Sequence, residues 1–427
     1  MGKPNIFPAV IVAAVLLALG ISYFGADSCS RCDDGNPCTA DLCSIDTQYR
    51  CMHTALDGEY GGCSGETDEC HAKTCSSGAC VEEQVSACSY SLECNAPALL
   101  NPPYEHYKTA LGEPTLQCTV SNLDGVAGKV ELSAAVEGYS GVFEKTIELG
   151  PNETKEIGVA LNFNEKFYSL EESTFSTLKT RLSRSNYTLQ SNSETIQMEK
   201  ATIYAPPRGE EELLAVWVTY NDPCIEEIIS EAKKLTPDGE FRAYQREEDD
   251  RMEEMEAVFY ALRYQNITYV SSSFSTTDIG TTFYNQNVRL PYQSLKYKQM
   301  NCVDGAVLYS AILEKLEYET AVAFSPGHAF VLVKSRDSGW GLGFFGSMFS
   351  GWDSEWIAIE TTDTGDPEAT FEDAVRAGQR NLDQATQIVD VHSAIEEGIV
   401  PLPVGGHQCG IADLSQKAEE HQALMGN

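Results

Sequence analysis

Hydrophobic residues follow three different patterns along the 427 residues. The first is a nearly uncharged apolar run from Ile6 to Gly25, preceded by Lys3, which matches the roughly 20 residues that a helix needs to cross a bilayer. A cleaved signal peptide is the alternative, but its apolar region usually has about 7–15 residues and ends at small side chains, which the residues around Tyr23 fit poorly. The pattern predicts a transmembrane signal-anchor at residues 1–26, with the bulk of the chain outside the cytoplasm.

The second pattern is an alternation of apolar and polar positions that begins after Pro103. Short alternating segments are separated by turn signals rich in Gly, Asn and Pro, and their apolar members are Leu116, Cys118, Val120, Val130, Leu132, Ala134, Ile147, Leu149, Ile157, Val159 and Leu161. This spacing predicts an all-β immunoglobulin-like sandwich over residues 99–205, a module that commonly serves as a spacer or a binding surface. Within it, we expect a helix from Tyr168 to Leu182.

The third pattern has the period of a helix and starts a C-terminal domain at residues 206–410. Asp222 is a suitable N-cap with Pro223 at the first helical position. A second helix is expected from about Asp249, with a stripe of core side chains at Met252, Met255, Phe259 and Leu262. Residues 411–427 form a polar C-terminal tail.

Cysteine usage adds a fourth region between the apolar run and the sandwich. Of the 15 cysteines, 11 fall between Cys29 and Cys94, in a stretch poor in aliphatic residues. Such a density predicts a disulfide module at residues 27–98 and an oxidising, extracellular compartment. A zinc site that uses Cys29 and Cys32 is the alternative. The stretch CDDGNPCTADLC resembles short Cys-rich repeats of secreted and surface proteins, which implies a spacer or adhesive role.

Charge excludes one class of partner. The chain has 64 acidic and 29 basic residues, a net charge of −35, which repels a phosphate backbone and argues against nucleic acid. Three sequons, at Asn152, Asn186 and Asn266, are compatible with an exported surface. The expected partners are therefore a protein or peptide substrate at the cell surface and the membrane itself.

The residues that suggest chemistry are Cys302, His328 and Glu360. Cys302 precedes a helical pattern, so its thiol is expected near the positive end of a helix dipole, where a thiolate is stabilised. His328 begins a hydrophobic strand, and Glu360 ends another strand that can lie beside it. A thiol nucleophile needs a base, and the base needs an acid that orients it.

The stretch from about Leu214 to Pro403 resembles the transglutaminase-like branch of the papain-like thiol enzymes. The resemblance is carried by NCVDG, PGHAF, ETT, FEDAVRAG and IVDVHSAIEEGIVPLP. It implies an α+β domain with a Cys-His-Glu triad that acts on amide or peptide bonds as a protease, amidase or acyl transferase. It implies no metal and no organic cofactor.

Two departures from that family concern neighbouring residues. Most members have an Asp before a Pro-Thr pair, whereas Glu360 stands before two Thr, which leaves Asp363 and Asp366 as reserve candidates for the acid. Asn301 occupies the place of the Gln that precedes the nucleophile in transglutaminases. Asn301 and Gln293 are therefore the candidates for an oxyanion donor.

A glycine-spaced aromatic run lies between His328 and Glu360. We interpret it as a substrate-contact loop or lid, with a hairpin folded onto its own domain as the alternative; its candidates are Trp340, Phe344, Phe345 and Trp352.

The sequence thus predicts a multidomain fold: a transmembrane helix, a disulfide-rich module, an immunoglobulin-like sandwich and an α+β transglutaminase-like domain. The alternative function is a non-catalytic surface binding or adhesion protein that uses this domain as a scaffold. The state of Cys302 separates the two functions, because a catalytic thiol must be free. Without Cys302 an even number of cysteines remains, so that all the others can pair. We expect Cys118 to complete the N-terminal set and Cys224 to pair with Cys409, although a metal pair at His407 and Cys409 is conceivable.

Overall fold

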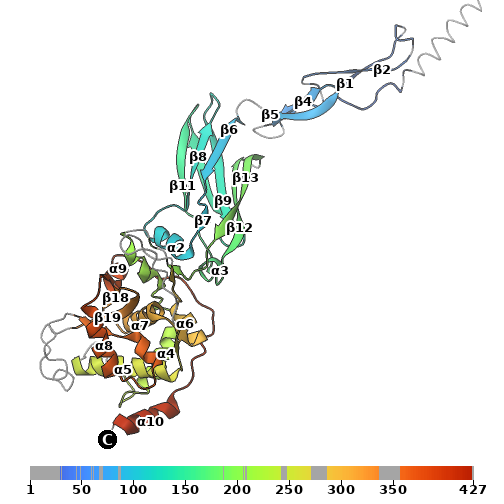
Figure 1. Cartoon of the computed structure of the whole chain (residues 1–427). Helices are drawn as coiled ribbons and strands as arrows, with labels where there is room; N and C mark the ends of the chain where they lie inside the picture. Colours follow the sequence, from blue (N-terminus) through green and yellow to red (C-terminus); the bar gives the residue numbers. More distant parts are fainter. Residues whose placement is uncertain are drawn as a thin grey trace, which may run out of the picture.

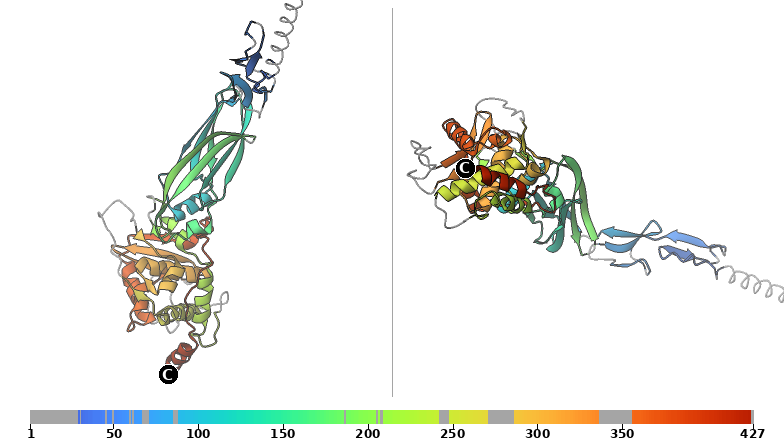
Figure 2. Two further views of the ribbon diagram at one scale, coloured as in Figure 1. Left: turned by 90° about the vertical axis from the view of Figure 1, so that its right-hand side faces the viewer. Right: turned by 90° about the horizontal axis from the view of Figure 1, so that it is seen from below.

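The protein is a chain of three bodies in a row, each dominated by a different kind of packing (Figures 1 and 2). The structure is a computed structural model, which describes residues 29–425 except 30, 45, 49, 59, 61, 67–70, 85–87, 186, 205, 207–208, 242–247, 271–285 and 336–355. A small module of strands lies at one end, a pair of β-sheets follows, and a helix-rich body with its own sheet lies at the other end.

Disulfides take the place of a hydrophobic core in the first body. Its hairpin and its small sheet are formed by β1 (Thr39–Leu42), β2 (Met52–Ala55), β3 (Gly65–Glu66), β4 (His71–Ser76) and β5 (Ala79–Gln84). The bonds that hold these strands include Cys29–Cys43, Cys38–Cys75 and Cys63–Cys80. The Cys-rich, disulfide-bonded character predicted for this region is confirmed, and such bonds suggest an extracellular protein.

Two β-sheets face each other across one apolar core in the second body (Figure 1). The larger has the order β10-β9-β12-β13-β7 and the smaller β11-β8-β6. The strands are β6 (Tyr90–Asn95), β7 (Leu99–Leu100), β8 (Leu116–Asn122), β9 (Gly128–Val136), β10 (Phe143–Leu149), β11 (Thr154–Val159), β12 (Thr174–Arg184) and β13 (Tyr187–Met198). Strands β8 to β11 lie where the alternating pattern predicts them, because every second side chain enters the core.

The helix expected from Tyr168 to Leu182 is wrong. Helix α3 (Glu165–Tyr168) ends where it was expected to begin, and β12 runs through most of the interval. Strand β12 pairs with both β9 and β13, and Leu178, Thr180 and Leu182 enter the core from it. Tertiary pairing on two edges therefore overrides the local preference.

The third body surrounds a four-stranded antiparallel sheet of order β20-β19-β18-β21. Its strands are β18 (Thr320–Ser325), β19 (His328–Lys334), β20 (Trp356–Ile359) and β21 (Gln387–Asp390). Four further strands of two residues each are β14 (Ile203–Tyr204), β15 (Thr268–Tyr269), β16 (Gln286–Asn287) and β17 (Gln299–Met300). One face of the sheet packs on helix α7 (Cys302–Lys315), and the other carries a separate apolar cluster against Leu382 and Ala385.

The helices of the third body pack on this sheet or on one another. They are α4 (Pro223–Lys233), α5 (Glu248–Tyr264), α6 (Pro291–Tyr297), α7 (Cys302–Lys315), α8 (Phe371–Leu382), α9 (Val391–Glu396) and α10 (Ser415–Met425), with 3-10 helices η2 (Glu211–Trp217) and η3 (Thr361–Gly365). Helix α2 (Pro102–Ala110) of the second body lies against η2, and His106 bonds the carbonyl of Pro401 at 3.1 Å. The predicted caps at Asp222 and Pro223 are confirmed.

The C-terminal segment after α9 is fastened to the third body. The disulfide Cys224–Cys409 joins it to α4, and Cys94–Cys118 joins two strands of the smaller sheet in the second body. Cys224 and Cys409 are the expected pair, and Cys118 completes the N-terminal set as expected, with Cys94 as its partner. The predicted polar tail includes helix α10, which buries Ala418 and His421.

The predicted single-pass membrane protein is wrong. Among the described residues, no helix is both long enough and apolar enough to cross a membrane; α5, with 17 residues, is rich in Asp, Glu and Arg. The anchor predicted at residues 1–26 lies outside the described part of the chain. The described part of the chain is therefore a mixed α/β arrangement of several sheets with disulfides.

Candidate active site

Cys302 lies at the first position of α7, as the sequence predicts. The N-cap Asn301 accepts a hydrogen bond from the backbone N–H of Asp304 at 2.8 Å, and Asp304 accepts from the backbone N–H of Asn301 at 3.0 Å. Arg289 donates to the same oxygen of Asp304 from its side chain at 2.8 Å and to the other oxygen from its backbone N–H at 2.7 Å. The start of α7 is thus fixed from two sides, and Cys302, 2% exposed and outside any disulfide, is fixed with it.

His328 is the first residue of β19 and follows a turn through Gly327. Its Nε2 lies 2.5 Å from a carboxylate oxygen of Glu360. The imidazole of His328 also hydrogen-bonds the sulfur of Cys302. The antiparallel pairing of Val331 with Ile359 explains why His328 and Glu360 lie together, because it places the end of β20 beside the beginning of β19.

Four donors converge on the two carboxylate oxygens of Glu360. One oxygen accepts from His328 and from the side-chain amide of Asn381 at 2.9 Å; the other accepts from the backbone N–H of Thr362 at 3.0 Å and from its hydroxyl at 2.6 Å. Burial alone would raise the pKa of Glu360, but the bonds from His328 and Thr362 outweigh burial and lower it. The side chain is therefore held as a carboxylate although only 5% of it is exposed.

The same contacts hold His328 in its protonated form. The hydrogen bond with Cys302, followed by that with Glu360, raises the pKa of His328 to about 10, against the opposing effect of burial. His328 is thus bonded to both the Glu360 carboxylate and the Cys302 sulfur, and the charges of the three groups alternate in sign when the sulfur is a thiolate.

Close packing brings α7 against η3, the 3-10 helix that directly follows Glu360. A Cβ added at Gly305 would lie 2.5 Å from the Thr361 hydroxyl, so only glycine permits this approach of α7 to η3. The Tyr309 hydroxyl and the Thr364 hydroxyl are 2.7 Å apart one turn further along. The residues directly after Glu360 are therefore packed onto the helix that starts with Cys302.

Tyr269 is a neighbour of the site that sequence reasoning missed. It ends β15, which pairs in parallel with β17 immediately before Asn301, and 43% of the residue is exposed. Burial, followed by the negative charges of Cys302 and Glu360, raises the pKa of its hydroxyl. No sequence signal identifies it, since β15 has only two residues.

The predicted oxyanion donors and reserve acids lie around the three residues but make other contacts. Gln293 is buried, and its side-chain oxygen accepts from the backbone N–H of Leu290 at 3.0 Å, while the Asn301 oxygen caps α7. Asp363 lies in η3, where burial and then the charge of Glu360 raise its pKa to about 6. Among the described carboxylates, Glu360 is the one bonded to His328, so the reserve acids Asp363 and Asp366 are not needed.

The remaining predicted residues belong to the aromatic loop and to the alternative metal sites. The loop candidates Trp340, Phe344, Phe345 and Trp352 lie outside the described residues. The metal alternatives lose their ligands, because Cys409 and Cys29 are in disulfides, and His407 instead bonds a carboxylate oxygen of Asp222 at 2.8 Å.

Comparisons with known proteins give little further information. No family model matches the chain, and no curated protein matches it. Among solved structures, a mutant of Salmonella alpha-2-macroglobulin is similar at 14% identity over 56% of this chain and 17% of that chain, with a TM-score of 0.18. The chain thus spans less than a fifth of that protein's length, and a likeness of this size supports no conclusion about fold or function.

Proposed function

We propose that the third body is a transglutaminase-like thiol enzyme that cleaves or transfers acyl groups at amide or peptide bonds through Cys302, His328 and Glu360. The single observation that carries the proposal is that His328 is bonded both to Glu360, at 2.5 Å, and to Cys302. A buried cysteine with a merely structural role needs no imidazole with a carboxylate behind it.

The proposed reaction begins with attack of the Cys302 thiolate on a substrate carbonyl. The helix N-terminus and the imidazolium both stabilise negative charge on this sulfur. The backbone N–H of Asp304 in the first turn of α7 is already bonded to the Asn301 side chain, so the backbone N–H of Cys302 is the candidate donor to the oxyanion that forms. His328 then gives its proton to the leaving amine, and an acyl-enzyme remains on Cys302.

The second half of the reaction determines the enzyme class. Water that attacks the acyl-enzyme gives a protease or amidase, whereas an amine gives a transferase. His328 accepts the proton of the attacking water or amine in both cases. Glu360, itself held by Thr362 and Asn381, keeps the ring in the orientation that presents one nitrogen to the sulfur.

The alternative function, a non-catalytic binding domain, is favoured by one observation: Cys302 is only 2% exposed. Incubation with p-nitrophenyl acetate, followed by intact-mass and peptide analysis at low pH, separates the two. The enzyme proposal predicts a burst of p-nitrophenol and an acetyl group on Cys302, both lost in Cys302→Ser. Turnover and acetylation that persist in Cys302→Ser, or a wild type without any acetyl-cysteine, would contradict it.

A further inference from the structure

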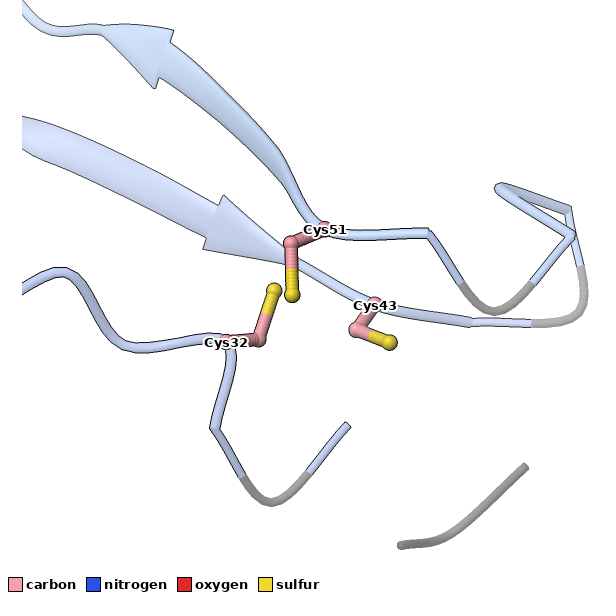
Figure 3. Close-up of side chains that lie close together, drawn as sticks. All are labelled: Cys32, Cys43 and Cys51. Atoms are coloured by element: carbon pink, nitrogen blue, oxygen red, sulfur yellow. The ribbon is translucent and has the colours of Figure 1, made fainter. Parts of the chain in front are cut away.

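Three sulfur atoms gather in the first body, away from the candidate active site. Those of Cys32, Cys43 and Cys51 all lie within 4.8 Å of one another (Figure 3). Cys43 is bonded to Cys29, whereas Cys32 and Cys51 are in no disulfide. Figure 3 shows the side chains of Cys32 and Cys51 pointing toward each other, with the sulfur of Cys43 turned away from both.

The strand pairing explains why these residues meet. Strands β1 and β2 end their pairing at Leu42 and Met52, so Cys43 and Cys51 continue the two arms of the same hairpin. Cys32 lies on the segment before β1 and is buried against this hairpin, with its thiol directed to the carbonyl of Leu42 at 3.6 Å. The backbone thus holds the thiol of Cys32 beside the hairpin end, where Cys51 is exposed.

The charges around this pair do not suit a thiolate. The hydrogen bond with Cys51, burial, and the charges of Cys51 and Asp41 raise the pKa of Cys32 to about 11. Reactive redox cysteines and metal-binding thiolates instead require surroundings that stabilise the deprotonated sulfur. The nearby imidazole of His53 is bonded to Asp41 at 2.6 Å, so its charge is already paired.

We propose that Cys32 and Cys51 are a further disulfide of the mature protein. The oxidant is a disulfide of low molecular weight, such as oxidised glutathione. The exposed Cys51, as its thiolate, attacks one sulfur of the oxidant and displaces one thiolate, which takes up the proton of Cys51. Cys32 then attacks the sulfur of Cys51 in the mixed disulfide, and the second glutathione leaves with the proton of Cys32.

This bond has two consequences. The segment before β1 becomes tied to one arm of the hairpin by Cys29–Cys43 and to the other by Cys32–Cys51, in a module that has few aliphatic side chains to hold it. Cys302 is then the remaining thiol among the cysteines that the structure describes. The inference does not depend on the proposed enzyme function, because it concerns another body of the chain.

The test uses the full chain, folded in a buffer of reduced and oxidised glutathione and then alkylated with iodoacetamide in guanidinium without reduction. The wild type should carry a single label, at Cys302. Cys51→Ser should gain one label at Cys32, and the control Cys302→Ser should carry none at either position. A double variant, Cys32→Ser with Cys51→Ser, should again carry a label at Cys302 alone, which keeps the test valid if the single variant misfolds.

Several results would overturn the inference. Labels on both Cys32 and Cys51 in the wild type would show a free dithiol. A label on Cys29, with Cys43 linked to Cys51 or to Cys32, would show a different pairing. Zinc that copurifies in stoichiometric amount, with both thiols released by a chelator, would show a metal site instead.

Discussion

The carboxylate of Glu360 is the most informative single group to change, and Glu360→Gln is the change that keeps its length and volume. Both oxygens of the carboxylate accept two hydrogen bonds each, and the side chain is 5% exposed. A glutamine amide has one oxygen and one NH2, so two of the four donors would face another donor. The variant therefore loses a charge and two well-made hydrogen bonds at a site with little solvent.

The expected effect is a loss of the charged form of His328. A hydrogen bond to a charged group contributes about 1.5–3 kcal/mol, and about 1.4 kcal/mol corresponds to a factor of ten. We therefore expect the rate of iodoacetamide labelling at Cys302 at pH 6 to fall about 10- to 100-fold in Glu360→Gln, as measured by peptide mass. The matched control is Asp363→Asn, which removes a neighbouring carboxylate that has no bond to His328 and should change the rate by less than about threefold. An unchanged rate in Glu360→Gln, or an equal loss in both variants, would refute this reasoning.

Three further predictions concern stability and the support of the site. Pairing raises the pKa of His328 above its ordinary 6.5 to about 10. Its contribution to stability is therefore complete below pH 6.5 and is lost as the pH rises toward 10. The difference in unfolding free energy between wild type and His328→Gln, measured by urea titration, should shrink over that range. Gly378→Ala should lower the unfolding free energy by about 1–3 kcal/mol, since the new Cβ would lie 2.4 Å from the Ala358 carbonyl oxygen, and a stabilised variant would contradict the close packing of α8 on β20. Replacing both Cys224 and Cys409 by Ala should cost about 2–5 kcal/mol in guanidinium unfolding, because the bond closes a loop of 185 residues, and an unchanged midpoint would show that the disulfide does not constrain the unfolded chain.

Local signals identified α7, α4 and the pair Cys224–Cys409, because each of these signals depends on residues close together in the sequence or on the number of cysteines. The start of α7 could be predicted from the apolar pattern after Cys302, and α4 from Asp222 and Pro223. Cysteine parity gave the pair Cys224 and Cys409, because few cysteines lie outside the first body.

What the sequence did not give depends on contacts between distant segments. Asn381 reaches Glu360 only because α8 packs on β20, and Tyr269 reaches the site only because β15 pairs with β17. The strand that replaces the expected helix after Tyr168 is fixed by its two neighbouring strands. The sequence also did not show that the side-chain oxygens of Asn301 and Gln293, the candidate oxyanion donors, are used as helix caps.

The central claim is that Cys302 is an activated thiolate paired with His328. The most direct test is the rate of labelling of the folded, unreduced protein by iodoacetamide from pH 4 to pH 9, with each modified cysteine located by peptide mass, in wild type and His328→Ala. The account predicts labelling of Cys302 that is already rapid below pH 7 and is slowed by the His328 change at that pH. Labelling that rises only near pH 8.5, the ordinary pKa of a thiol, and that is the same in both proteins would contradict the claim and leave the third body as a binding domain.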